Sequence, residues 1–394
     1  MICTLSIAGM ILTSANGNEW KLYENSSIGT LWYIQFIDDM RGWANGQDND
    51  INFDSNGRAL ITSIVLRTED GGETWKKINF NTSFRFIKQI FFLTKNDGWA
   101  VGEQRGDDEK MHSIILSTKN GGDSWDVVSF IENSNVVLVN IYFSNENVGW
   151  VSGFDYGEVL DEEFGDNLIL ATNIGGLILY TNDSGKNWTK KYRHEQLLIL
   201  NTQTLSSINH GPTVEGLRSI DYIAFSDNNH GWAVGDYDDK ILHTNDGGKT
   251  WRVQKSNLLS LEPDPRQSSN FRQISAIDNN NVWVVGGEGQ IYKTTDGGTE
   301  WKKVVPGNEY DNTYWTSVKF IDDKHGWIGS LNGVILSTKD GGINWVREVM
   351  PYEKTVISAP SEDRIGISDF AITKTKIFVA LMDGRIYSKN LNSK

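Results

Sequence analysis

The 394-residue sequence has a single cysteine, Cys3, so no disulfide can form within the chain. It is poor in basic residues: 37 Lys and Arg stand against 51 Asp and Glu, a formal net charge of −14. No basic tract offsets that charge, which argues against a nucleic acid or an anionic membrane as partner. No stretch approaches the roughly 20 apolar residues that span a bilayer, and no segment has the periodicity of an amphipathic helix.

Tryptophan, in contrast, is abundant, and most of its 15 copies lie in two repeated phrases. The first phrase reads Thr-x-Asp-Gly-Gly-x-x-Trp, recurs about every 50 residues and ends at Trp75, Trp125, Trp188, Trp251, Trp301 and Trp345, with a degenerate copy at Trp20. Units of this size cannot bury their own apolar faces, so they must stack on one another.

The third position of this phrase is predicted to hold a tight turn together. It is occupied by Asp70, Asn120, Asp183, Asp246, Asp296 and Asp340. We expect these side chains to accept hydrogen bonds from backbone amides two or three residues on, while the glycines supply positive φ. Asn120 can make a similar turn.

The second phrase is Gly-Trp, or Val-Trp in one unit, and it includes Trp43, Trp99, Trp150, Trp232, Trp283 and Trp327. Seven residues before each tryptophan stands Phe36, Phe92, Phe143, Phe225, Ala276 or Phe320, and an Ile or Val lies two residues further upstream. A spacing of two is the period of a strand, so each unit opens with one. The complete unit contains four short antiparallel strands, which is the pattern of a β-propeller blade.

The two ends of the chain predict the number of blades. After the sixth complete unit, residues 367–372, 377–381 and 385–390 supply three strands, and the chain stops where a fourth should follow. Residues 19–23 can supply the missing strand and close the ring. We therefore predict an all-β, seven-bladed propeller over residues 18–394.

The alternation of the two phrases, clearest from Gly231 through Asp246 to Trp251, resembles the neuraminidase-type Asp-box repeat proteins. More narrowly, roughly residues 18 to 390 resemble the photosystem II assembly and stability factor family and its relatives in non-photosynthetic bacteria. The resemblance implies structural Asp-box turns and a non-enzymatic scaffold that grips a partner protein. Photosynthetic members are expected to carry an arginine cluster, and the acidic balance here favours a bacterial relative with a different client.

Residues 1–17 precede the predicted ring. Residues 2–12 are mildly apolar, and Ala15 and Gly17 stand at positions that a signal peptidase reads, so we expect an export signal and a periplasmic or extracellular protein. No Lys or Arg precedes the apolar run, however. The alternative is that residues 10–13 form a strand that runs into the degenerate turn.

Departures from the repeat are the best pointers to function, because folding already explains the shared residues. Trp32 and Trp315 lie outside the repeated phrases, and five basic residues lie at or just before the first strands: Arg85, Lys88, Arg218, Arg272 and Arg364. Because the innermost strands line the axial channel, these residues predict a recognition rim at one channel mouth. The alternative role for Trp32 and Trp315 is to fill the core between blades.

Two long connections are predicted at the same mouth. Residues 190–217 and 254–270 each join a fourth strand to the next first strand, and loops of this length usually have a function or lack order. The first connection contains an apolar run, residues 197–200. We interpret this run as a partner-binding patch or a cover over the channel mouth.

Catalytic interpretations have less support. Residues 84–87 resemble only faintly the Arg-Ile-Pro signature of sialidases. An acidic insertion in the third unit could supply two glycosidase carboxylates, although clustered like charges favour a solvated loop; it contains Asp155, Glu158, Asp161, Glu162, Glu163 and Asp166. We predict no catalytic residue and no cofactor.

One segment has the alternate oxygen-bearing residues of a calcium loop: Asp48, Asp50, Asn52 and Asp54. Phe53 stands where such a loop needs glycine, and no bidentate Glu follows at the required distance, so we predict no metal site. The sequence thus predicts a monomeric protein that binds a protein partner through its channel mouth. The alternative is a carbohydrate-active propeller, either a glycoside hydrolase or a glycan binder that uses Trp32 and Trp315.

Overall fold

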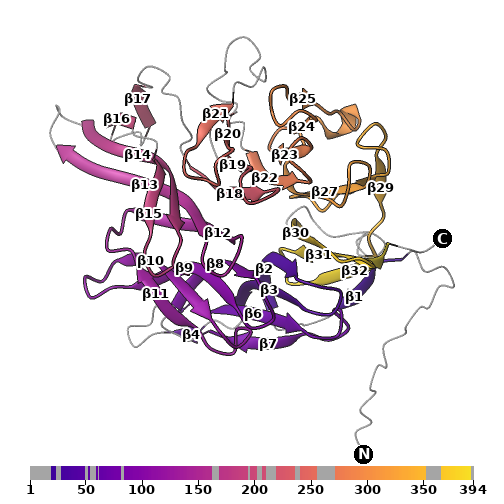
Figure 1. Ribbon diagram of the computed structural model, residues 1–394, viewed down its shortest axis with the longest axis horizontal. Helices are drawn as coiled ribbons and strands as arrows, with labels where there is room; N and C mark the ends of the chain where they lie inside the picture. The colour runs from indigo at the N-terminus through magenta and orange to yellow at the C-terminus, as the bar shows by residue number, and fades with distance from the viewer. Residues whose placement is uncertain are drawn as a thin grey trace, which may run out of the picture.

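The computed structural model is a ring of seven antiparallel blades, each with four consecutive strands and one enlarged by two more, which confirms the predicted β-propeller (Figure 1). It describes residues 19–23, 28–48, 52–53, 59–60, 62–80, 84–161, 168–193, 196–201, 206–209, 219–235, 240–254, 271–351 and 365–391. A 3-10 turn, η1 (Asn308–Tyr310), precedes blade 6. No helix in the described part of the chain has the length and apolar character needed to cross a bilayer.

Five blades follow one path, in which the first strand is innermost and each later strand pairs with the one before it. Blades 1 and 2 consist of β2 (Ile28–Phe36), β3 (Gly42–Asp48), β6 (Ser63–Thr68) and β7 (Lys76–Asn79), and of β8 (Phe84–Phe92), β9 (Gly98–Arg105), β10 (Met111–Thr118) and β11 (Asp126–Phe130). A small hairpin, β4 (Asn52–Phe53) and β5 (Ala59–Leu60), lies between β3 and β6.

Blades 4, 5 and 6 repeat this path with shorter strands. They consist of β18 (Tyr222–Phe225), β19 (Gly231–Val234), β20 (Ile241–Thr244) and β21 (Arg252–Gln254); β22 (Phe271–Ala276), β23 (Val282–Gly286), β24 (Ile291–Thr294) and β25 (Lys302–Lys303); and β26 (Trp315–Phe320), β27 (Gly326–Ser330), β28 (Ile335–Thr338) and β29 (Val346–Glu348).

Blade 7 joins the two ends of the chain, as the sequence predicts. Its strands are β30 (Ile367–Ile372), β31 (Lys376–Leu381), β32 (Ile386–Asn390) and, from the other end, β1 (Lys21–Tyr23). Leu22 lies opposite Tyr387 in the β1–β32 pair, and Trp20 is buried in the same cluster as Val379 and Tyr387. This closure pairs the outer edge of the last blade, an edge that would otherwise be open.

Blade 3 is larger than predicted. Its strands are β12 (Val136–Phe143), β13 (Gly149–Asp161), β14 (Leu168–Thr181), β15 (Thr189–Arg193), β16 (Gln196–Asn201) and β17 (Ser206–Asn209). Both β15 and β16 pair with the long β14, and the strands β13, β14 and β16 project beyond the ring (Figure 1). The expectation that residues 197–200 lie in a surface loop was therefore wrong, because they belong to β16.

Aromatic side chains lock neighbouring blades together. The Gly-Trp tryptophan of one blade stacks on the repeat phenylalanine of the next: Trp43 and Phe92 lie 4.0 Å apart at an interplanar angle of 7°. The Asp-box tryptophan of that second blade, Trp125, meets the same phenylalanine edge-on at 5.8 Å. Trp99 with Phe143 and Trp283 with Phe320 repeat the stack. Such pairs contribute about 0.5–1.5 kcal/mol beyond the burial of apolar area.

The glycine of the Gly-Trp phrase makes room for the phenylalanine of its own blade. A Cβ on Gly98 would lie 2.7 Å from the Phe92 ring, and the two residues face each other across β8 and β9. Blade 5 contains the reverse arrangement, because Ala276 lies opposite Val282. The sequence thus exchanges a large and a small residue across one strand pair while keeping the space filled.

The Asp-box turns share one hydrogen-bonding scheme. The box side chain accepts a bond from the backbone N–H four residues on, at 2.9–3.0 Å in all six turns. The amide three residues on, as predicted, also bonds the carboxylate in the five aspartate turns. The preceding threonine donates to the same oxygen and accepts from the second glycine, as Thr244 does with Asp246 and Gly248. Asn120 makes the same turn through its Oδ1, as predicted.

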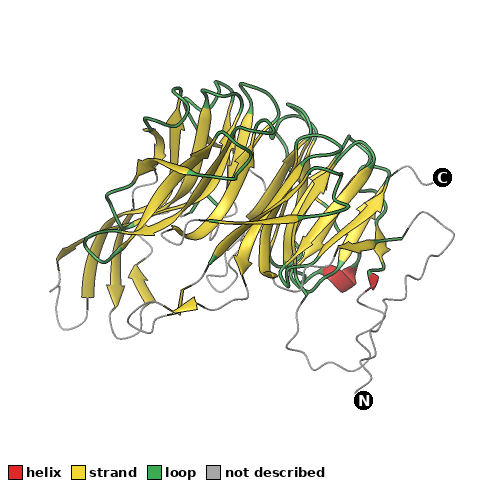
Figure 2. Cartoon of the chain, turned by 90° about the horizontal axis from the view of Figure 1, so that it is seen from below, coloured by secondary structure: helices red, strands yellow, loops and turns green. Residues whose placement is uncertain are grey.

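The two faces of the ring differ in what they carry. The face at which each first strand begins, called here the strand-one face, carries η1, the β4–β5 hairpin and the extended strands of blade 3. The opposite face, the Asp-box face, carries short turns between first and second strands and between third and fourth strands. Figure 2 shows the short turns along one edge and the extensions along the other.

Candidate functional site

The seven innermost strands surround the propeller axis, each in contact with the next: β2, β8, β12, β18, β22, β26 and β30. Each of them carries a polar residue three positions before the end of the strand. These residues are called here the axial ring: Tyr33, Gln89, Asn140, Tyr222, Gln273, Ser317 and Asp369. A β-bulge or register shift directly precedes the ring residue in six blades, and such bulges re-aim the side chains beside them.

Hydrogen bonds join the axial ring across the blade interfaces. In four blades the amide of the residue after the ring position donates to the ring side chain of the preceding blade: Ile141 to Gln89 at 2.7 Å, Ile223 to Asn140 at 3.2 Å, Val318 to Gln273 at 2.6 Å and Ile34 to Asp369 at 3.3 Å. Gln273 Nε2 also donates to Asp369 Oδ1 at 2.8 Å. The first strands are the inner edges of their sheets, and the neighbouring blade satisfies amides that no further strand pairs.

The axial ring is electrostatically coupled; five of its residues are buried, and the side chains of Tyr33 and Tyr222 are half-buried by solvent exposure. Burial raises the pKa of Asp369, while Lys319 and Gln273 act in the opposite direction. Burial and the charge of Asp369 raise the pKa of Tyr33, which hydrogen-bonds Gln89. Burial also raises the pKa of Tyr222, which lies across the ring in blade 4 and senses both Tyr33 and Asp369. Side chains from blades that are not neighbours meet at the axis, as the hydrogen bond between Gln273 of blade 5 and Asp369 of blade 7 shows.

The residue before each axial-ring position lies one step nearer the strand-one face. These seven residues are called here the mouth ring: Trp32, Lys88, Val139, Asp221, Arg272, Thr316 and Ser368. All seven are half-buried. Three of the predicted binding residues, Trp32, Lys88 and Arg272, thus occupy equivalent positions around one channel mouth.

Contacts within and between blades hold the charged members of the mouth ring in place. Arg272 Nη1 lies 3.3 Å from Asp221 Oδ2 in blade 4, and its Nε donates to the hydroxyl of Tyr314 before blade 6. Lys88 Nζ lies 3.4 Å from Glu103 and 5.0 Å from the centre of the Phe86 ring. An arginine held between a carboxylate and an aromatic ring loses less side-chain freedom on binding a ligand.

The other predicted binding residues do not join this ring. Trp315 is completely buried between blades 5 and 6 among Trp283 and Val318, so its assignment to a binding surface was wrong. The core role that we kept as an alternative is the one it has. Arg218 and Arg364 lie outside the described residues, as does the side chain of Arg85.

The acidic insertion does not form an isolated loop where it is described. Asp155, Glu158 and Asp161 lie in β13, and Asp155 is buried with Arg193 Nη2 at 2.7 Å. Glu162, Glu163 and Asp166 lie outside the described residues. Of the candidate calcium ligands, Asp48 is buried against Lys77, and Asp50 and Asp54 are not described. No cluster of three metal-ligating side chains occurs within the described ranges.

The sequence contains a signal for the axial ring that the prediction of binding residues did not include. In every blade a polar residue stands three positions before the repeat phenylalanine or its counterpart and directly before an Ile, Val or Phe. A polar residue at one fixed position of every inner strand indicates a shared environment on the axis. The mouth ring follows from it by a shift of one residue.

Comparisons with known proteins agree with the fold. Residues 212–311 match the family model described as photosynthesis system II assembly factor YCF48. A curated relative, the photosystem II assembly lipoprotein Ycf48 of Synechococcus sp. (strain CC9902), is 33% identical over 94 residues. That match spans 22% of this chain and only about a quarter, 26%, of the relative.

Solved structures resemble the whole ring. YCF48 bound to D1 peptide superposes with a TM-score of 0.60 at 17% identity, covering 94% of this chain and 97% of that one. The GH74 xyloglucanase of Xanthomonas campestris gives 0.59 at 11% identity, covering 95% of this chain and 54% of the enzyme. At such identities the likeness concerns the fold alone. The chain is an Asp-box repeat propeller that resembles the photosystem II assembly factor Ycf48.

Proposed function

We propose that this protein is a non-enzymatic scaffold that binds a partner protein at the mouth ring on the strand-one face. One observation carries the proposal: seven equivalent half-buried positions surround the axis on that face and include Trp32, Lys88 and Arg272. Aromatic and arginine side chains dominate protein-binding hot spots. The hydrogen-bonded axial ring beneath them forms the floor of the mouth.

The comparisons support the same class of function. A solved structure of similar fold is YCF48 bound to D1 peptide, so a ring of this architecture is able to hold a polypeptide segment. For this chain the partner is a protein segment that offers carboxylates to Lys88 and Arg272 and an apolar group to Trp32. Ion pairs and cation–π contacts would then add to apolar burial.

The second candidate is a carbohydrate-active propeller, because GH74 enzymes share the fold. A glycosidase of the common kind needs two carboxylates that face each other across a sugar-sized cleft. The described carboxylates at the mouth, Asp221 and Glu103, are each paired with a cation, Arg272 and Lys88. Pairing of this kind favours a binding role over catalysis.

Affinity purification of the tagged full chain from its own host tests the proposal. We expect one stoichiometric protein partner, and we expect Trp32→Ala, Lys88→Ala and Arg272→Ala each to weaken its binding by about tenfold or more. The control is Lys339→Glu, an exposed charge reversal on the Asp-box face, which should leave binding unchanged. Recovery of no protein, together with turnover of a glycan, would favour the carbohydrate-active alternative.

We also infer that the protein is exported and works as a monomer. The export prediction comes from residues 1–17, which lie outside the described residues, and the curated relative is named a lipoprotein, which is compatible with export. Fractionation of cells that express the full chain tests it, and recovery in the cytoplasm alone would contradict it. Sedimentation of the purified protein tests the oligomeric state.

A further inference from the structure

The outer wedge between blades 2 and 3 is less filled than the wedges between blades 1 and 2 and between blades 6 and 7. Ile78 in the fourth strand of blade 1 and Phe80 directly after that strand are buried against blade 2, and the Phe80 ring centre lies 5.4 Å from that of Trp125. Met350 is completely buried at the corresponding place between blades 6 and 7. Large apolar side chains therefore close these wedges.

A β-bulge prevents this filling in blade 2. In blade 1, Ile78 lies opposite Val65 of the third strand. The equivalent partner in blade 2, Ile115, faces Ser129 because the β10–β11 register shifts by one residue between Ile115 and Leu116. Phe130 consequently turns away from the wedge: it is 42% exposed and stacks on His112.

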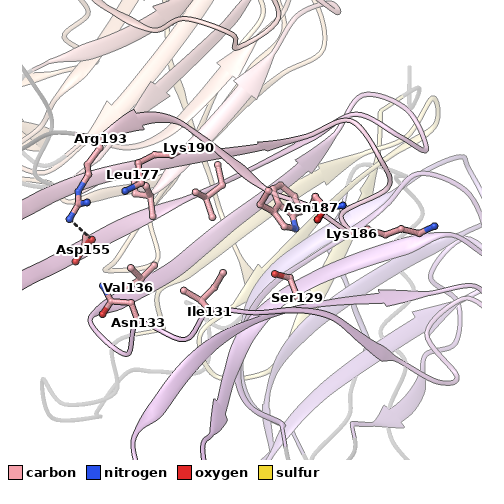
Figure 3. A pocket seen from close by; sticks show the side chains of 12 residues that line it. Ser129, Ile131, Asn133, Val136, Asp155, Leu177, Lys186, Asn187, Lys190 and Arg193 are labelled. Carbon is pink, nitrogen blue, oxygen red and sulfur yellow. Dashed lines mark hydrogen bonds and ion pairs between the residues drawn. The ribbon is translucent and has the colours of Figure 1, made fainter.

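The result is a groove of about 410 Å³ between the outer strands of the two blades (Figure 3). Its apolar floor consists of Ile131, Val136, Leu177, Leu179 and Trp188, and Ser129 lies on the blade 2 side. The groove follows β15 from the Asp-box turn at Lys186 to Arg193. Its volume falls within the range of ligand sites in proteins.

The rim of the groove is cationic, although the chain as a whole carries a charge of −14. Lys186, Lys190 and Arg193 line it, and its single carboxylate, Asp155, is bound to Arg193. Within the described residues, Lys186 and Lys190 have no carboxylate partner, and both are exposed. An apolar floor between two lysines suits an anionic ligand with an apolar body.

We propose that this groove binds an extended segment of a partner polypeptide in which a bulky apolar side chain is flanked by carboxylates. The apolar side chain occupies the space beside Trp188 that Phe80 fills in the neighbouring wedge, and the carboxylates pair with Lys186 and Lys190. An extended segment fits because the groove runs along a strand and opens onto the rim. This site lies on the outer wall and is independent of the mouth ring.

Fluorescence anisotropy with the full chain tests the proposal. The probes are short labelled peptides that carry Phe, Trp, Tyr or Leu between aspartates, and matched peptides in which lysines replace the aspartates or glycine replaces the apolar residue. We expect at least one acidic peptide to bind saturably and its matched peptides to bind about tenfold more weakly or worse.

Variants locate the binding. Ser129→Phe should refill the wedge as Phe80 does and weaken binding about tenfold without lowering the melting temperature. The double variant Lys186→Glu, Lys190→Glu should also weaken peptide binding about tenfold, by charge reversal. This variant tests the location of binding if Ser129→Phe does not fold. The matched control is Lys249→Glu, which changes the equivalent Asp-box lysine of blade 4 and should change affinity less than about twofold.

Three results would overturn the proposal. The first is that none of the acidic peptides binds saturably. The second is that Lys249→Glu weakens binding as much as the groove variants, which would mean nonspecific attraction. The third is that Trp32→Ala abolishes binding while both groove variants retain it, which would place the peptide at the channel mouth.

Discussion

The Asp-box face and the strand-one face belong to the same seven sheets, but the connections on the first are regular and those on the second vary in length. On the Asp-box face, six turns repeat one hydrogen-bonding scheme, and their lengths do not vary. On the strand-one face, the connections range from the tight turn at Gly287–Gln290 to the long strands of blade 3. Regular turns stabilise the ring, and variation on the other face leaves the ring unchanged.

The comparison teaches that a residue's role depends on its depth along the first strand as well as on its type. Trp32 and Trp315 both lie on first strands outside the repeated phrases. Trp32 immediately precedes an axial-ring residue and is half-buried, whereas Trp315 lies two residues before one and faces the neighbouring blade. Alternation along the strand assigns one to the mouth and the other to the core.

Exchange of these two tryptophans for alanine should give the largest contrast. Trp315→Ala leaves a cavity between blades 5 and 6 and should cost about 3–5 kcal/mol of unfolding free energy. Trp32→Ala should cost less than about 1 kcal/mol, because its side chain already contacts solvent. Denaturant unfolding of both variants measures the difference, and equal losses would remove the distinction between mouth and core.

The glycine–phenylalanine pair of blade 2 should show strong coupling. Phe92→Ala alone should cost about 3 kcal/mol through loss of the stack on Trp43, and Gly98→Val alone should cost about 1–3 kcal/mol through overlap with the Phe92 ring. The double variant copies the Ala276–Val282 pair of blade 5 and should lose less than the sum. If the losses add up in a double-mutant cycle, the large and small residues are not exchangeable across this strand pair.

Removal of the Asp369 carboxylate should destabilise the propeller without changing the surface of either face. Asp369→Ala leaves Gln273 Nε2 and the Ile34 amide without their buried acceptor, a loss on the order of 2–3 kcal/mol. Thermal unfolding measures this loss. The control is Thr375→Ala, an exposed residue in the turn after β30, which should cost under about 0.5 kcal/mol.

The smallest effect should come from a single Asp-box carboxylate. Partial burial opposes ionisation of Asp246, but hydrogen bonds from Thr250 and Thr244 lower its pKa to about 2. Its contribution to stability is therefore present above the unfolded pKa, about 3.9, and is lost as the pH falls towards about 2. Asp246→Asn should keep the turn, as Asn120 does, while weakening the acid dependence of the melting temperature. An unchanged acid profile would contradict this account.

Most of the architecture could be read from the chain, because repetition exposes each structural requirement seven times. The strand order, the shared blade 7 and the turn role of Asn120 follow from local periodicity and turn chemistry. The enlargement of blade 3 did not follow, because residues 197–200 pair with a strand about 30 residues earlier. Pairing over such a distance depends on partners that a local pattern does not identify.

The sequence by itself determined the unit, its number and the closure of the ring, since each depends on spacing along the chain. Only the tertiary structure decided which side chains meet. Seven separated polar residues meet at one axis, six of them directly after a bulge, and a bulge beside Ser129 opened a groove whose counterpart between blades 1 and 2 is filled. A bulge changes register by a single residue, and that one residue determines whether a side chain faces the core, the channel or solvent.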